Sequence, residues 1–308
     1  MRLVVFIEPQ MGASYADQLR IARHAEDLGF DGFFRSDHFL AMGRYLEAGG
    51  QPGPTDAWTT LSAIADRTSR IRLGTLVTAA TFRLPGPLAI TVAQADQMSG
   101  GRVELGLGAG WYEGERAAYG VPFPPLAERF DRLEEQLAIV TGLWRTPPGE
   151  YFDFDGRHYQ VAKSPALPKP VQVPGPPVII GGAGPRRTPA LAARYADEFN
   201  VPFATLEQTA AAYRRVTEAC AAIGRDTLPV WSAAQTVACG RTEAEARARA
   251  ERVFATPPLS GTPDQVVDRI GAWAERGTRR LFLQILDLAD LDHLDVIASS
   301  VLPQLATD

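Results

Sequence analysis

The feature that most restricts the fold of this chain is a regular alternation of short apolar runs with longer amphipathic segments. Short apolar runs are typical of buried parallel strands, and apolar residues three and four apart are typical of helices that cover a sheet. Eight such strand and helix pairs follow one another along the 308 residues. The predicted strands cover residues 2–7, 31–34, 71–77, 102–107, 177–180, 198–201, 230–238 and 281–286.

Eight strands alternating with helices over this length predict an α/β fold, a (β/α)8 barrel of the TIM type rather than a doubly wound open sheet. We expect one domain over residues 1–308. In such a barrel the carboxyl ends of all the strands open into one mouth, where ligands bind. Candidate functional residues are therefore those that directly follow a strand.

Residues 146–177 interrupt the alternation between the fourth and fifth strands. The segment is rich in proline and predicts a hairpin around Phe154–Arg157. We interpret it as an inserted lid that excludes water and shapes a substrate pocket. In the alternative interpretation its aromatic side chains form a small satellite core that holds the hairpin. The side chains in question are Tyr151, Phe152, Phe154, His158 and Tyr159.

Two glycine-rich turns follow predicted strands. Gly181-Gly182-Ala183-Gly184 leads from the fifth strand into a helix, and Gly108-Ala109-Gly110 follows the fourth strand. Small residues let backbone amides approach an anion, and a helix N-terminus favours negative charge. We therefore predict a phosphate site at 181–184, to which Arg186 and Arg187 could add charge. The alternative is ordinary turn geometry and close packing.

The second strand ends in Ser36-Asp37-His38. Imidazole is the side chain whose unperturbed pKa lies near neutrality, so His38 is the candidate for proton transfer. Asp37 could orient or charge it, although neighbouring residues of a strand point to opposite faces. The alternative is a structural histidine.

Two further side chains follow the fourth strand. Trp111 could line the substrate space or pack on the barrel rim. Glu113 is expected to cap the short helix that comes next.

Composition excludes several classes of function. A net charge of −5 argues against a surface built for nucleic acid or an anionic membrane, and no apolar run approaches the ~20 residues of a membrane span. The two cysteines predict no disulfide framework, which favours a reducing cytoplasm. The four histidines lack the spacing of metal ligands, so we predict no metal site.

Taken together, the strand ends resemble those of the bacterial-luciferase-like monooxygenase superfamily. The closer resemblance is to its branch of coenzyme F420-dependent (deazaflavin) oxidoreductases. The matching segments run in the same order along the chain from residue 14 to about residue 225. They are AEDLGFDGFFRSDHF, TTLSAIADRTSRIRLGTLVT, SGGRVELGLGAGWYEGE, ERFDRLEEQLAIV, PPVIIGGAG and ARYADEFN.

This resemblance implies a flavin-like cofactor across the barrel mouth and a homodimer. Both glycine turns would lie along the cofactor tail, and His38 would sit over the reactive ring. The resemblance also implies a non-prolyl cis peptide between Leu76 and Val77 that bulges under the ring. Leu76 has no polar side-chain atom, so contact there would come from the backbone.

We therefore predict an F420-dependent oxidoreductase that transfers a hydride between the deazaflavin and a small organic substrate, with His38 as proton donor or acceptor. Two alternatives remain. One is an FMN-dependent two-component monooxygenase that receives reduced flavin from a partner. The other is a catalytically silent flavin-binding barrel.

Overall fold

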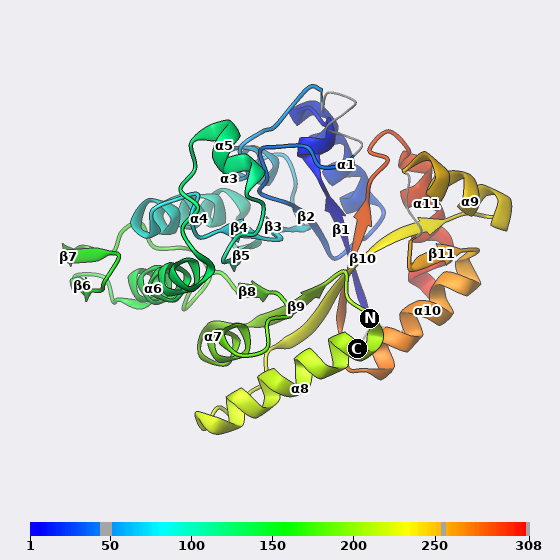
Figure 1. Cartoon of the computed structure of the whole chain (residues 1–308). Helices are drawn as coiled ribbons and strands as arrows, with labels where there is room; N and C mark the ends of the chain where they lie inside the picture. Colours follow the sequence, from blue (N-terminus) through cyan, green and yellow to red (C-terminus); the bar gives the residue numbers. More distant parts are fainter. Residues whose placement is uncertain (44–50, 254–256, 306–308) are drawn as a thin grey trace.

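Eight parallel strands close into a barrel in this computed structural model, which describes residues 1–43, 51–253 and 257–305 (Figure 1). The barrel closes through parallel pairs between β1 and β12 and between β9 and β10. This confirms the (β/α)8 prediction. In order around the barrel the strands are β1 (Arg2–Ile7), β2 (Gly32–Arg35), β3 (Arg72–Thr75), β5 (Val103–Gly108), β8 (Val178–Gly181), β9 (Glu198–Pro202), β10 (Val230–Cys239) and β12 (Arg280–Ile285).

Helices surround the barrel, and polar side chains at their N-termini fix where several of them begin. Ser14 and Asp17 form a capping box at α1, and Thr205 and Gln208 form another at α8. The described helices are α1 (Tyr15–Asp27), α3 (Ala57–Ala65), α4 (Pro85–Ser99), α5 (Gly114–Tyr119), α6 (Leu126–Arg145), α7 (Arg187–Tyr195), α8 (Leu206–Ala222), α9 (Glu243–Arg252), α10 (Pro263–Glu275) and α11 (Leu291–Ser300), with 3₁₀ turns η1 (Pro9–Met11) and η2 (Leu302–Gln304).

The apolar side chains form two layers because each barrel strand is buried on both faces. In β1, Leu3 and Val5 belong to the large layer between the strands and the helices. Val4 and Phe6 point the other way, into a small cluster inside the barrel. Burial on both faces explains why the strands read as continuous apolar runs in the sequence.

Buried charges close one end of the barrel. The Arg280 guanidinium, 1% exposed, donates to Glu104 at 2.6 Å and to Glu198 at 3.0 Å and forms an ion pair with Asp31 at 2.8 Å. Arg72 also pairs with Glu104. Arg280 and Glu198 begin their strands, so this cluster marks the amino end of the barrel, and the mouth lies at the other end.

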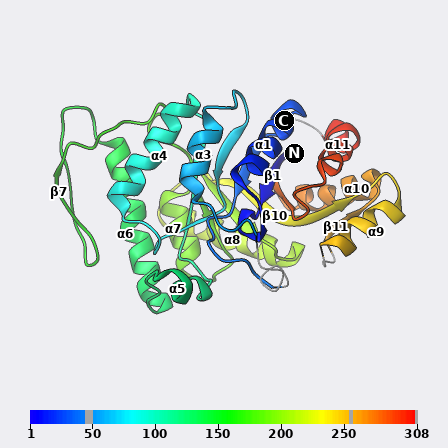
Figure 2. The same ribbon diagram turned by 90° about the horizontal axis from the view of Figure 1, so that it is seen from above.

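Four short strands lie outside the barrel. β4 (Thr78–Ala79) pairs with β5, and β11 (Leu259–Gly261) pairs with β10, and neither was among the strands predicted from the sequence. β6 (Phe152–Asp155) and β7 (Gln160–Ser164) form the predicted antiparallel hairpin. Figures 1 and 2 both show this hairpin beside α6 on the outside of the barrel. No helix of the described residues has the length and apolarity to cross a membrane.

Candidate active site

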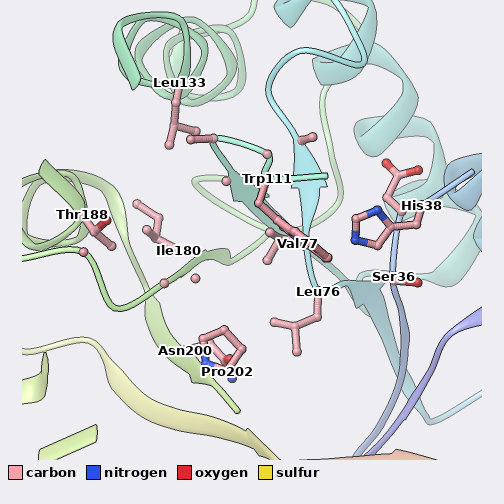
Figure 3. Close-up of a pocket in the computed structure, with 18 of the residues that line it drawn as sticks. Ser36, His38, Leu76, Val77, Trp111, Leu133, Ile180, Thr188, Asn200 and Pro202 are labelled. Atoms are coloured by element: carbon pink, nitrogen blue, oxygen red, sulfur yellow. The ribbon is translucent and has the colours of Figure 1, made fainter. Parts of the chain in front are cut away.

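A pocket of about 390 Å³ lies where the carboxyl ends of the strands meet. Residues that end or follow β1, β2, β3, β5, β8 and β9 line it (Figure 3). It brings together every predicted site residue except Ala183, which is exposed. The predicted residues that line it are Asp37, His38, Leu76, Val77, Gly108, Ala109, Gly110, Trp111, Gly181, Gly182 and Gly184.

Val77 contributes an apolar side chain to the lining of the pocket. The Leu76–Val77 peptide is cis, as the family resemblance implied. A Cβ at Gly106 or Gly108 would lie 2.9 Å from a methyl carbon of Val77, and one at Gly181 would lie 3.4 Å away. The close-packing interpretation of these glycines is therefore supported: they make room for the Val77 side chain.

His38 is held by a carboxylate that the sequence prediction missed. Its Nδ1 lies 3.1 Å from both oxygens of Glu115, and Glu115 is only 2% exposed. The rings of Trp111 and Tyr112 face the imidazole edge-on at 5.6 and 6.0 Å. Burial opposes the charged imidazolium, but the hydrogen bond and charge of Glu115 outweigh it, so the pKa of His38 is raised.

Asp37 does not hydrogen-bond His38, which corrects the idea that it orients the imidazole. Its carboxylate accepts a hydrogen bond from the Thr78 hydroxyl at 2.8 Å and pairs with Arg83. Successive residues point to opposite sides of an extended chain, and this separates the two side chains. Asp37 therefore fixes the loop that carries Arg83.

The prediction that Glu113 caps the short helix is also corrected. It occupies the N-cap position of α5, but its side chain makes no capping hydrogen bond. Glu115, one residue inside the helix, instead accepts from the backbone amides of Phe39 at 2.5 Å and Leu40 at 3.2 Å. The GWYEGER segment contains both acids, and only the packing of α5 onto the loop after β2 distinguishes them.

Glu8 and Ser36, which line the pocket, belong to a chain of hydrogen-bonded polar side chains that the sequence analysis missed. Glu8 accepts from Gln10 at 2.7 Å and from Gln284 at 3.0 Å. Ser36 donates to Gln10 at 2.7 Å, and Thr236 donates to Gln284 at 2.6 Å. Glu8 follows β1 and Gln284 lies on β12, so only closure of the barrel brings them together.

The turn after β8 provides groups that fit an anion. Gly182 has a φ of +135°, which glycine adopts readily. Helix α7 begins at Arg187, and its N-cap residue Arg186 makes no side-chain cap, so first-turn amides remain available. Thr188, 5% exposed, lines the pocket and has no hydrogen-bond partner among the described side chains. The sequence prediction missed this hydroxyl.

The contribution predicted for Arg187 is corrected. Its guanidinium pairs with Asp131 at 2.6 Å and with Glu134 at 3.5 Å, both on α6. Its charge is therefore already compensated on the outside of the barrel. Arg186 is exposed.

The prediction that residues 146–177 form a lid is corrected as well. None of these residues lines the pocket. The Phe152 ring packs against α6, where a Cβ at Gly142 would lie 2.3 Å from it, and Phe154 and Tyr159 also contact the main core. The hydrophobic contact with α6 and the main core holds the hairpin beside the barrel, so Phe152, Phe154 and Tyr159 pack on the main core and not in a separate satellite core.

The described residues contain no cluster of three or more His, Cys, Asp or Glu side chains that could hold a metal ion.

Comparison with known proteins decides the family. The model of the luciferase-like monooxygenase family matches residues 1–258. The chain belongs to this family. An F420-dependent glucose-6-phosphate dehydrogenase of Microbacterium testaceum is 36% identical over 176 residues, which cover 57% of this chain and 49% of that protein. The chain thus matches about half the length of that relative.

Other similar proteins match more of the chain. An uncharacterized protein of Mycobacterium tuberculosis is 32% identical over 272 residues, covering 84% of this chain and 92% of that protein. Two solved structures each cover 99% of this chain and share its fold. They are an F420-dependent secondary alcohol dehydrogenase with an F420–acetone adduct (TM-score 0.84, 20% identity, 99% of that chain) and a monooxygenase of Streptomyces bottropensis (TM-score 0.83, 22% identity, 100% of that chain).

Proposed function

We propose that this chain is an F420-dependent oxidoreductase that transfers a hydride between the deazaflavin and a small organic substrate. The observation that carries the proposal is one pocket with Thr188 and a glycine turn suited to an anion at one side and His38 at the other (Figure 3). Val77 and Ile180 lie between them and present an apolar surface suited to a flat ring. Relatives named as F420-dependent dehydrogenases support the choice of cofactor.

Different residues of the pocket would bind the cofactor and transfer the proton. F420, when bound, supplies the hydride chemistry. The amides around Gly182 and the hydroxyl of Thr188 would bind its phosphate, while Val77 supports the ring from below. His38 would give or take the proton at the substrate, and the Trp111 ring beside it would restrict access of water.

Direct titration tests the cofactor. We expect the fluorescence of F420 to fall or shift when F420 binds the purified chain. We also expect F420 to bind more tightly than FMN. Tighter binding of FMN would instead favour the two-component monooxygenase. That alternative rests on the phosphate-binding turn, which would accept either cofactor, and on a fold neighbour solved with FMN.

Turnover separates an enzyme from a silent flavin-binding barrel. We expect His38→Ala to retain F420 binding and to lose about 10²–10⁴-fold in turnover of a productive substrate, the usual contribution of a positioned acid or base. Equal turnover of the variant and the native chain would remove His38 from the mechanism.

We also propose that the chain forms a homodimer. The outer face of α4 supports this, since Ile90 and Met98 on that helix are 43% and 48% exposed. Light scattering would give twice the 33.4 kDa mass of one chain for a dimer. A mass of one chain at micromolar concentration would contradict it.

A cytoplasmic location is proposed as well. Cys220 and Cys239 are both buried free thiols, which fits a reducing compartment. Cell fractionation of a producing strain checks it, and recovery of the chain with secreted proteins would overturn it.

A further inference from the structure

We infer that Glu115 is a positioning residue that holds His38 as a cationic proton donor, and that the pocket is thereby set for substrate reduction. This inference deepens the proposed function and rests on it. The contact between Glu115 and His38 joins α5 to the loop after β2.

The hydrogen bond fixes which ring nitrogen is available. Both Glu115 oxygens lie 3.1 Å from Nδ1 of His38. An ionised carboxylate only accepts hydrogen bonds, so Nδ1 must carry a proton. Nε2 is then the ring nitrogen left to serve the pocket that His38 lines.

The charged groups around His38 favour its protonation. Glu115 faces it from α5, Glu8 from the end of β1, and Asp37 precedes it in the chain. The Asp37 charge is balanced by Arg83, and Glu8 is held by neutral amides. Burial of the imidazole works against the cation, but these carboxylates outweigh it and raise the pKa of His38. The contact with Glu115 thus favours the imidazolium, with protons on both nitrogens, more than in a free histidine.

A protonated His38 suits one direction of hydride transfer. For reduction of a polarised double bond, F420 bound in its reduced form would supply the two electrons as a hydride for the new C–H bond. The neighbouring atom, which would receive the π electron pair, would take its proton from Nε2 of His38, so the substrate would gain two electrons and the cofactor would lose two. His38 is left neutral, still donating from Nδ1 to Glu115, and regains a proton from solvent. Oxidation would need a neutral His38 at the start.

A purely structural role for Glu115 is the competing explanation, because its Oε1 also accepts from the amides of Phe39 and Leu40. Glu115→Gln separates the two roles. The amide oxygen of glutamine still accepts those backbone hydrogen bonds, whereas the negative charge beside His38 is removed. Glu113→Gln is the matched control, since it removes the same charge two residues away, where no side-chain cap exists.

Nuclear magnetic resonance of the ring nitrogens in the full-length chain tests the inference without a substrate. We expect both nitrogens of His38 to be protonated at pH 7, with the signal assigned by its loss in His38→Asn. Glu115→Gln should lower the pKa of His38 by about one unit or more, and Glu113→Gln should leave it within a few tenths.

Two results would overturn the inference: a neutral His38 in the native chain at pH 7, or the same pKa in Glu115→Gln as in the native chain. The first measurement needs no variant, so the test stands even if Glu115→Gln does not fold. Failure of F420 to bind the native chain would instead refute the proposed function, since the His38 titration is read in the absence of cofactor.

Discussion

Val77 and Gly108 meet across the floor of the pocket. A Cβ at position 108 would lie 2.9 Å from Cγ2 of Val77, closer than side-chain carbons approach in folded proteins. Gly106 is tighter still, since its Cβ would lie 2.0 Å from the Thr75 carbonyl oxygen. The glycines of β5 thus serve the packing of the preceding strand end, and through it the shape of the ligand surface.

We predict that Gly108→Ala lowers the free energy of unfolding by about 1–3 kcal/mol, the usual cost of overpacking, and weakens F420 binding because Val77 must move. Gly106→Ala should cost more, since it meets backbone. Gly271→Ala in α10 is the control: its Cβ would meet nothing within 4 Å. Urea denaturation of the three variants checks the order. A Gly108→Ala variant as stable as the native chain would show that Val77 has room to move.

The Thr188 hydroxyl should contribute to cofactor affinity. Thr188→Val keeps the shape of the side chain but removes its one donor, so we predict that F420 binds about 10- to 150-fold more weakly, the value of one hydrogen bond to a charged group. Thr209→Val, at another buried hydroxyl without a hydrogen-bond partner, lies outside the pocket and should leave affinity unchanged. Fluorescence titration gives both values. Equal losses would point to a general effect on folding.

The fold could be predicted from sequence because it depends on local patterns. The spacing of apolar residues predicts each strand and helix of the barrel. Residues that follow a strand lie at the barrel mouth wherever that strand occurs in the chain. His38 and the two glycine turns were found for that reason. The register between distant strands was not needed to place them.

The missed residues depend on contacts between segments far apart in sequence. Glu115 meets His38 across 77 positions, and Gln284 meets Glu8 across 276. Nothing in either local sequence distinguishes Glu115 from Glu113. The lid interpretation failed similarly: the aromatic residues of the hairpin could have covered the mouth or α6, and only the position of Gly142 on α6 shows which surface receives Phe152.

The buried cluster at the amino end of the barrel should be sensitive to loss of its cation. Arg280→Met leaves Glu104, Glu198 and Asp31 without their shared partner, and breaking a buried pair in this way costs about 3–5 kcal/mol. Arg279→Met changes the exposed neighbour and should have little effect. Thermal denaturation at pH 7 compares them. Similar melting temperatures would mean that water or protonation of a carboxyl group compensates for the missing charge.

Stability should also fall in mild acid because of His293 on α11. Its Nε2 accepts a hydrogen bond from the Cys239 amide at 2.9 Å, which requires that nitrogen to be unprotonated. Burial, together with the charge of Arg249, lowers the pKa of His293 from 6.5 to about 4. Between these pH values the unfolded chain takes up a proton that the folded chain does not, so the free energy of unfolding should fall by up to about 3 kcal/mol as pH drops from 6.5 to 4. Above pH 7 this contribution is constant.

His293→Gln offers an amide oxygen to the Cys239 amide and does not titrate, so its urea midpoint should depend less on pH across this window. An identical pH dependence in the variant would assign the acid sensitivity to the carboxylates instead.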